Sequence, residues 1–152
     1  MLAGVSRIRV AAYVLRERGS WQLLVFEQSA HPDAGLQIPA GGVRPDECLP
    51  DAVLREVGEE TGLVGLTIRG QLHTENAPHP ISGGLRTTRY FVVDAPPDTP
   101  DAWTHRVHGD GFDSEMIFHC RFESLPLQHP LADNQDAGLG LVHPTFTTTS
   151  RR

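Results

Sequence analysis

The order of apolar and polar residues along the chain predicts a protein built mainly on a β-sheet, with one central helix. Residues 7–15 and 21–27 are rich in β-branched and other apolar side chains, and the turn-forming residues between them predict a β-hairpin. Residues 50–61 have helical spacing instead, with a proline suited to the first turn. Gly62 is placed to end this helix in a left-handed conformation.

Three further strands are expected after the helix, at residues 66–74, 87–94 and 116–123. Between the last two, residues 95–113 are rich in proline, glycine, histidine and aspartate, and we expect them to form a long surface loop. The segment after residue 142 is rich in threonine and arginine and has no apolar periodicity, which predicts a flexible tail.

The size of the chain predicts a single domain over residues 1–152. With 39% hydrophobic and 21% charged residues, a chain of this length can bury one substantial core. It has no apolar run long enough to cross a bilayer and no secretion signal, so we expect a cytoplasmic protein without a membrane partner. Cys48 and Cys120 are too few and too far apart for a disulfide framework and are expected to be reduced thiols.

The formal net charge of -6 argues against binding to a nucleic-acid polymer, because such proteins concentrate lysine and arginine to neutralise phosphates. A small phosphorylated ligand remains compatible with this charge. Divalent metal ions can bridge carboxylates of an acidic protein to phosphate groups, so the charge favours a metal-assisted site.

Three carboxylates of the predicted helix carry the main chemical signal. Glu56, Glu59 and Glu60 stand at i, i+3 and i+4, which places them on one helix face, where they repel one another. A cation must offset this repulsion, either Arg55 at i−4 from Glu59 or a divalent metal ion. Oxygen ligands without histidine or thiolate favour Mg²⁺ or Mn²⁺. Taken alone, the same residues are also compatible with a solvated acidic face.

The wider spacing resembles the Nudix box, G-x5-E-x7-R-E-U-x-E-E-x-G-U with U an apolar residue. Every fixed position is matched, by Gly41, Glu47, Arg55, Glu56, Val57, Glu59, Glu60, Gly62 and Leu63. The resemblance implies the α+β Nudix fold, in which a mixed β-sheet is sandwiched between α-helices. It also implies a Mg²⁺-dependent hydrolase, with Mn²⁺ able to substitute, that cleaves the diphosphate linkage of a nucleoside diphosphate derivative.

The same resemblance implies the metal ligands. Glu56 and Glu60 match the usual ligands of the family, and Glu59 matches a residue that binds metal or helps to activate water. The backbone carbonyl of Ala40 matches a further metal ligand found in some members.

Two other box residues support these ligands in the family. Glu47 matches a carboxylate that assists the metal shell, and Arg55 matches an arginine that orients the glutamates through ion pairs. The general base stays open at this point, because Nudix enzymes recruit it from different places. It is Glu59, or a downstream acid for which Asp113 and Glu115 are the candidates.

Residues outside the box bear on the substrate. The sequence Pro39-Ala40-Gly41 resembles the entry to the box in ADP-ribose and nucleotide-sugar pyrophosphatases, although a turn-rich loop needs prolines and glycines in any case. Arg86 and Arg89 flank the start of a predicted strand and could bind a terminal phosphate of a small nucleotide, or could be solvated edge charges.

Several alternatives remain open on the sequence. A house-cleaning hydrolase of nucleoside triphosphates or dinucleoside polyphosphates would have a similar box. Ligand-sensing Nudix modules typically lose box glutamates, and all are present here. Nudix-type isomerases need a reactive cysteine, which Cys48 does not obviously match. The sequence also leaves a homodimer open.

Overall fold

The computed structural model describes residues 7–78, 84–107 and 116–149. The strands in these ranges are β1 (Arg7–Glu17), β2 (Trp21–Gln28), β3 (Ala40–Gly42), β4 (Thr67–Pro78), β5 (Leu85–Asp94), β6 (Ala102–Arg106) and β7 (Ile117–Ser124). The helices are α1 (Leu49–Thr61) and α2 (Leu139–Val142), with the 3₁₀ turns η1 (Pro32–Ala34), η2 (Ala132–Gly138) and η3 (Pro144–Phe146). Among the described helices, none is long and apolar enough to span a bilayer.

The strands form one mixed sheet in the order β4-β5-β1-β2-β7-β6, and β3 pairs with β1 beside this path. β1 and β5 run parallel, and the other pairs are antiparallel. The predicted hairpin is confirmed as β1 and β2, and the three later predicted strands are confirmed as β4, β5 and β7. β4 extends four residues beyond its predicted end because it pairs with β5 as far as Pro78 and Leu85.

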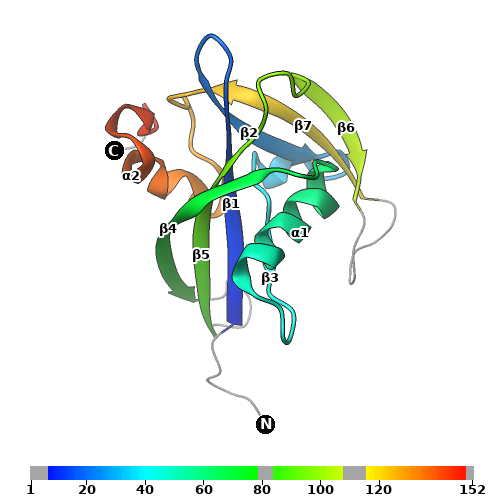
Figure 1. The fold of residues 1–152 in the computed structure, drawn as a ribbon, viewed down its shortest axis with the longest axis vertical. Helices are drawn as coiled ribbons and strands as arrows, with labels where there is room; N and C mark the ends of the chain where they lie inside the picture. The colour runs from blue at the N-terminus through cyan, green and yellow to red at the C-terminus, as the bar shows by residue number, and fades with distance from the viewer. Residues whose placement is uncertain (1–6, 79–83, 108–115, 150–152) are drawn as a thin grey trace.

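Both faces of the central strand β1 are buried. Val10, Ala12 and Val14 belong to the apolar cluster that includes Val53 and Val57 of α1. The alternate residues of β1, from Ala11 to Leu15, belong to a second cluster with side chains of the C-terminal segment. Figure 1 shows α1 against the middle of the sheet, with the C-terminal helices in a different layer. A strand that is covered on both faces has apolar residues at successive positions, which explains the continuous apolar run at residues 10–15 of β1.

β1 and β2 pair only near their turn and then separate. Their register runs from Glu17 opposite Trp21 to Leu15 opposite Leu23. Farther along, residues 37–42 fill the space between the two strands. On one side of this segment, Gln37 exchanges backbone hydrogen bonds of 2.8 and 2.9 Å with Phe26 of β2. On the other side, β3 pairs with β1. The sequence did not predict β3. This insertion brings Ala40–Gly42 beside the N-terminal half of β1 and next to α1.

The helix α1 begins one residue before its predicted start and ends at Thr61 as predicted. Gly62 adopts φ 81° and donates its N–H to the carbonyl of Gly58, so it ends the helix in the predicted left-handed conformation. The indole N–H of Trp103 donates to the carbonyl of Thr61 at 2.7 Å, which fixes the end of the helix to β6. Val57 is buried, which places the opposite, acidic side of α1 toward β3.

Two sequence expectations are wrong. The predicted loop at residues 95–113 contains β6, whose residues Ala102–Arg106 pair with β7 and lengthen the sheet. Residues 143–149 of the predicted flexible tail pack on the domain instead: Phe146 is buried against Trp21 and the second cluster, and the buried Thr148 hydroxyl donates to Asp136 at 2.6 Å. The structure of both segments depends on pairing and packing with distant parts of the chain. Such contacts leave no periodic pattern of apolar residues within the segment itself.

Candidate active site

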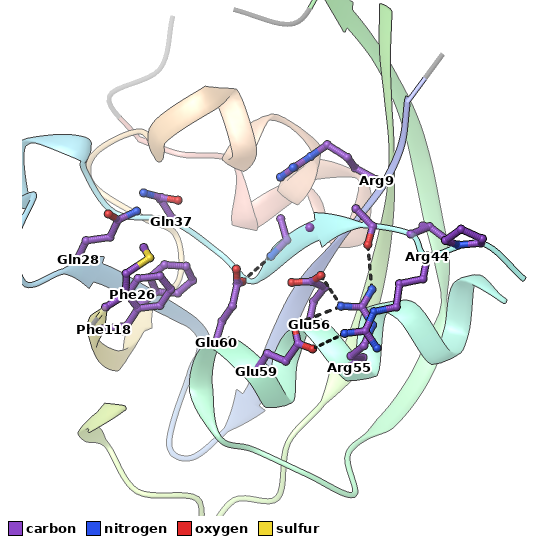
Figure 2. A pocket seen from close by; sticks show the side chains of 16 residues that line it. Arg9, Phe26, Gln28, Gln37, Arg44, Arg55, Glu56, Glu59, Glu60 and Phe118 are labelled. Carbon is purple, nitrogen blue, oxygen red and sulfur yellow. Dashed lines mark hydrogen bonds and ion pairs between the residues drawn. The ribbon is translucent and has the colours of Figure 1, made fainter. Parts of the chain in front are cut away.

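A cavity of about 800 Å³ opens where the acidic side of α1 faces β3 and the loop after it. Figure 2 shows the carboxylates of Glu56 and Glu60 directed toward β3 and that of Glu59 directed toward Arg55. Phe26 and Phe118, with rings stacked 4.2 Å apart between centroids, form an apolar wall of the same cavity. The cavity therefore joins a carboxylate cluster to a surface on which a planar ring could pack.

Arg55 holds the carboxylate cluster together. Its guanidinium donates two hydrogen bonds to Glu47, of 2.8 and 2.9 Å, and one of 2.8 Å to the carbonyl of Gly42. It also donates to Glu56 at 2.8 Å and to Glu59 at 3.2 Å. Arg55 thus positions Glu47, Glu56 and Glu59, which are not spread over a solvated helix face.

The pKa of the Glu47 carboxyl falls to about 2, chiefly because Arg55 donates hydrogen bonds to its ionised form. The backbone N–H of Arg44 adds a further hydrogen bond of 3.0 Å. Glu47 is therefore an anion at neutral pH that anchors Arg55, and through Arg55 it positions Glu56 and Glu59.

Glu56 and Glu60 are the most buried carboxylates of the cluster, with 4% and 5% of each residue exposed. Burial raises the pKa of Glu56, and burial together with the charge of Glu56 raises the pKa of Glu60 well above its usual range. Glu60 accepts one hydrogen bond, of 2.9 Å, from the N–H of Ala40. Within the described part of the chain, Oε1 of Glu56 is buried and has no hydrogen-bond partner. The pair therefore concentrates negative charge that the protein leaves incompletely neutralised.

The sequence of β3 allows this close approach. A Cβ atom at Gly41 would overlap the carboxylate of Glu56, so glycine lets the strand pass here without displacing that carboxylate. The N–H of Ala40 points to Glu60, and in an extended strand the carbonyl of the same residue points the same way. The carbonyl of Ala40 thus faces the glutamates.

The residues fit a hard divalent cation. All nearby donors are oxygens, which favours Mg²⁺ or Mn²⁺. In the ranges that the structure describes, no three His, Cys, Asp or Glu side chains converge closely enough to hold an ion by themselves. The carboxylate of Glu59 accepts a hydrogen bond from Arg55, and one oxygen of Glu60 accepts the N–H of Ala40. This arrangement still suits Mg²⁺, which keeps several waters and takes its other ligands from substrate phosphates.

Other predicted residues lie elsewhere. Arg86 forms an ion pair of 2.6 Å with Asp133, and Arg89 has a buried Nε without a partner among the described residues. Neither of the two arginines lines the cavity, so their binding to a substrate phosphate stays a prediction. Asp113 and Glu115 lie outside the described residues.

Two arginines of the site were missed by the sequence reasoning. Arg44 donates to Glu59 at 3.3 Å from the loop between β3 and α1. Arg9, on β1, lines the cavity from the other side of β3. The position of Arg9 directly before the apolar run 10–15 was the available signal, but only the tertiary structure shows what Arg9 faces.

Comparison with known proteins assigns this chain to a family. The NUDIX domain model matches residues 5–137. A Bacillus subtilis (strain 168) protein named "Putative 8-oxo-dGTP diphosphatase YtkD" is 45% identical over 49 residues, which are 32% of this chain and 28% of that relative. The match thus spans less than a third of the relative's length.

Solved structures show the same fold. The NUDIX domain of Shewanella oneidensis NrtR, in complex with ADP ribose, has a TM-score of 0.67 at 20% identity, covering 92% of this chain and 88% of that one. The MutT NUDIX hydrolase of Burkholderia pseudomallei has a TM-score of 0.61 at 20% identity, covering 90% and 98%. The chain therefore belongs to the NUDIX domain family and has its α+β fold.

Proposed function

We propose that the chain is a Mg²⁺-dependent hydrolase that cleaves the diphosphate linkage of a nucleoside diphosphate derivative, with ADP-ribose or a nucleotide sugar as the first candidate. The observation that carries this proposal is the buried pair Glu56 and Glu60 on the wall of the cavity. Oxygen Oε1 of Glu56 has no partner among the described residues, and Arg55 holds its other oxygen in place. Such a pair suits a cation that carries phosphate oxygens.

Glu56 and Glu60, with the carbonyl of Ala40, would hold the cation. When bound, a divalent ion would offset the charge of the diphosphate and lower the pKa of a water molecule. Arg55 keeps Glu56 and Glu59 aligned, because Glu47 and the carbonyl of Gly42 hold its guanidinium. Water adds to one phosphorus in line with the bridging oxygen, the bond from that phosphorus to the bridging oxygen breaks, and two phosphorylated products form.

The proton of the attacking water needs an acceptor. Glu59 is the candidate within the described residues, since its carboxylate lies in the cavity wall between Arg55 and Arg44. Asp113 and Glu115 remain the alternative candidates from the downstream segment.

The substrate proposal rests on Pro39-Ala40-Gly41, which resembles the entry to the box in ADP-ribose and nucleotide-sugar pyrophosphatases. The name of the Bacillus subtilis relative favours a second candidate, an oxidised nucleoside triphosphate. A ligand-sensing module is disfavoured because every box glutamate is present. We also propose that the enzyme acts in the cytoplasm on small nucleotides rather than on nucleic-acid polymers; a homodimer stays a prediction.

A substrate panel tests this proposal. ADP-ribose, a nucleotide sugar, a dinucleoside polyphosphate and 8-oxo-dGTP are incubated with Mg²⁺, with Mn²⁺ or with a chelator, and the products are identified. We expect metal-dependent release of two phosphorylated products from one member of the panel. Glu56→Gln should remove this activity, whereas Glu17→Gln, at an exposed position of β1, should not. Hydrolysis that survives both the chelator and Glu56→Gln would overturn the proposal.

A further inference from the structure

Arg9 occupies an unusual place in the cavity. It pairs with Gly42 of β3 on one side and with Thr88 of β5 on the other. By strand alternation its side chain shares a face of the sheet with Ala11 and Tyr13, away from α1. Figure 2 shows it extending across β3 on the side opposite the glutamates. The cavity therefore curves around β3, with carboxylates at one end and a guanidinium at the other.

The guanidinium of Arg9 has no direct partner among the described residues. Within residues 7–78, 84–107 and 116–149, no group offers this side chain a hydrogen bond or an ion pair. Most other described arginines are ion-paired with an aspartate or a glutamate: Arg16, Arg18, Arg44, Arg55, Arg69, Arg86 and Arg121. Arg9 differs from them although it is partly buried.

The surroundings of Arg9 disfavour its positive charge, so a bound anion would stabilise it. Burial lowers the pKa of Arg9, and the positive charge of Arg86 lowers it further. Arg86 is already paired with Asp133, and Glu60, Asp133 and Glu56 act on Arg9 only through longer-range attraction. An anion placed beside Arg9 would relieve this unfavourable charge.

The space beside Arg9 is open. Gly42 stands opposite Arg9 in the register, and a Cβ built on Gly42 would meet nothing within 4 Å. Arg9, Gly42 and the glutamates line the same cavity, so one ligand in it can contact both ends. The planar fork of a guanidinium fits the oxygens of a phosphoryl group well.

We propose that Arg9 binds the phosphoryl group of the substrate that is not held at the glutamates, and so sets the direction in which the diphosphate lies. This inference rests on the proposed function. It makes Arg9 a substrate-binding residue with selectivity for ligands that carry a second phosphoryl group. Arg86, which is fixed by Asp133, would strengthen the positive potential there without needing direct contact.

The test compares Arg9→Ala and Arg9→Lys with Arg69→Ala. Arg69 is an exposed arginine paired with Asp94 and lies outside this cavity, so it controls for the loss of one positive charge. With the best substrate of the panel, we expect Arg9→Ala to raise KM roughly tenfold to a hundredfold and to change kcat much less. Arg9→Lys should restore part of the affinity, because it keeps the charge but loses the fork. Arg69→Ala should leave both constants unchanged.

Binding measurements separate this inference from the proposed function. Calorimetry with inorganic pyrophosphate and Mn²⁺ should show weaker pyrophosphate binding to Arg9→Ala than to Arg69→Ala, while Mn²⁺ alone binds both equally. Melting temperatures should match that of the unchanged protein or exceed it, because an unpaired cation is removed. If no panel compound is hydrolysed but pyrophosphate binding still depends on Arg9, the activity is wrong and the anion site stands. Equal pyrophosphate binding and an unchanged KM in Arg9→Ala would overturn the inference.

Discussion

The guanidinium of Arg55 and the carboxylate of Glu47 form two parallel hydrogen bonds, Nε to Oε2 at 2.8 Å and Nη2 to Oε1 at 2.9 Å. This paired geometry fixes the plane of the guanidinium, so its remaining N–H groups point to Glu56, Glu59 and the carbonyl of Gly42. One arginine thereby aligns the loop, the strand β3 and the helix α1. The arrangement of the glutamates depends on this fork, and not on positive charge alone.

Arg55→Lys is expected to fold but to lose most of the activity. Lysine keeps the charge but cannot donate to Glu47, Glu56, Glu59 and a carbonyl at the same time. We expect a fall in kcat of roughly a hundredfold and a loss of about 2 kcal/mol in the free energy of unfolding. Steady-state kinetics and urea unfolding measure both. Arg69→Lys, at an exposed arginine that also donates two bonds to one carboxylate, is the matched control and should change neither.

Gly41→Ala tests the close packing of β3 on the glutamates. A methyl group at Gly41 would displace the carboxylate of Glu56, so Mn²⁺ affinity and turnover should both fall by roughly tenfold or more. Gly42→Ala is the adjacent control for Mn²⁺ affinity, because its methyl group would enter open space and would not meet Glu56. Titration with Mn²⁺ followed by electron paramagnetic resonance compares the two variants. Equal affinities would show that Glu56 is not a metal ligand.

The parts of the fold predicted correctly have local causes. The helix α1 was predicted within one residue because proline, apolar spacing and a terminal glycine all lie within a short segment. The box residues could be assigned together for the same reason, since Glu47 and Arg55 are only eight residues apart.

The parts that were missed depend on distant segments. β3 exists because β1 and β2 separate, and β6 exists because β7 lies beside it. Arg9 enters the site through its pairing with Gly42, which lies 33 residues farther along the chain. None of these contacts leaves a periodic pattern in its own segment, which is why local sequence reasoning did not find them.

The ordered C-terminal segment gives a stability prediction. Phe146 packs against Trp21 in the second apolar cluster, with ring centroids 6.4 Å apart. Phe146→Ala should lower the free energy of unfolding by about 2 kcal/mol, toward the lower end for aromatic truncations because the ring lies at the edge of the core. Leu141→Ala, at an exposed position of α2, should change it by less than about 0.5 kcal/mol. Similar values for the two variants in urea unfolding would contradict the burial of this segment.

The central claim is that Glu60 helps to hold the cation on which hydrolysis depends. Glutamine keeps the size of this side chain and can still accept the hydrogen bond from Ala40, but it carries no charge. Removing the charge also relieves repulsion between Glu60 and Glu56 within the buried pair. Without metal, Glu60→Gln should therefore be as stable as the unchanged protein, or more stable by about 1 kcal/mol.

The most direct measurement is the Mg²⁺-dependent turnover of Glu60→Gln on the best panel substrate, made together with its melting temperature and with Glu17→Gln as the exposed control. We expect turnover to fall roughly a thousandfold, because charge neutralisation by the metal stabilises the transition state by several kcal/mol. The melting temperature should be equal or higher, and Glu17→Gln should keep full activity. Full turnover by a folded Glu60→Gln protein would contradict the account.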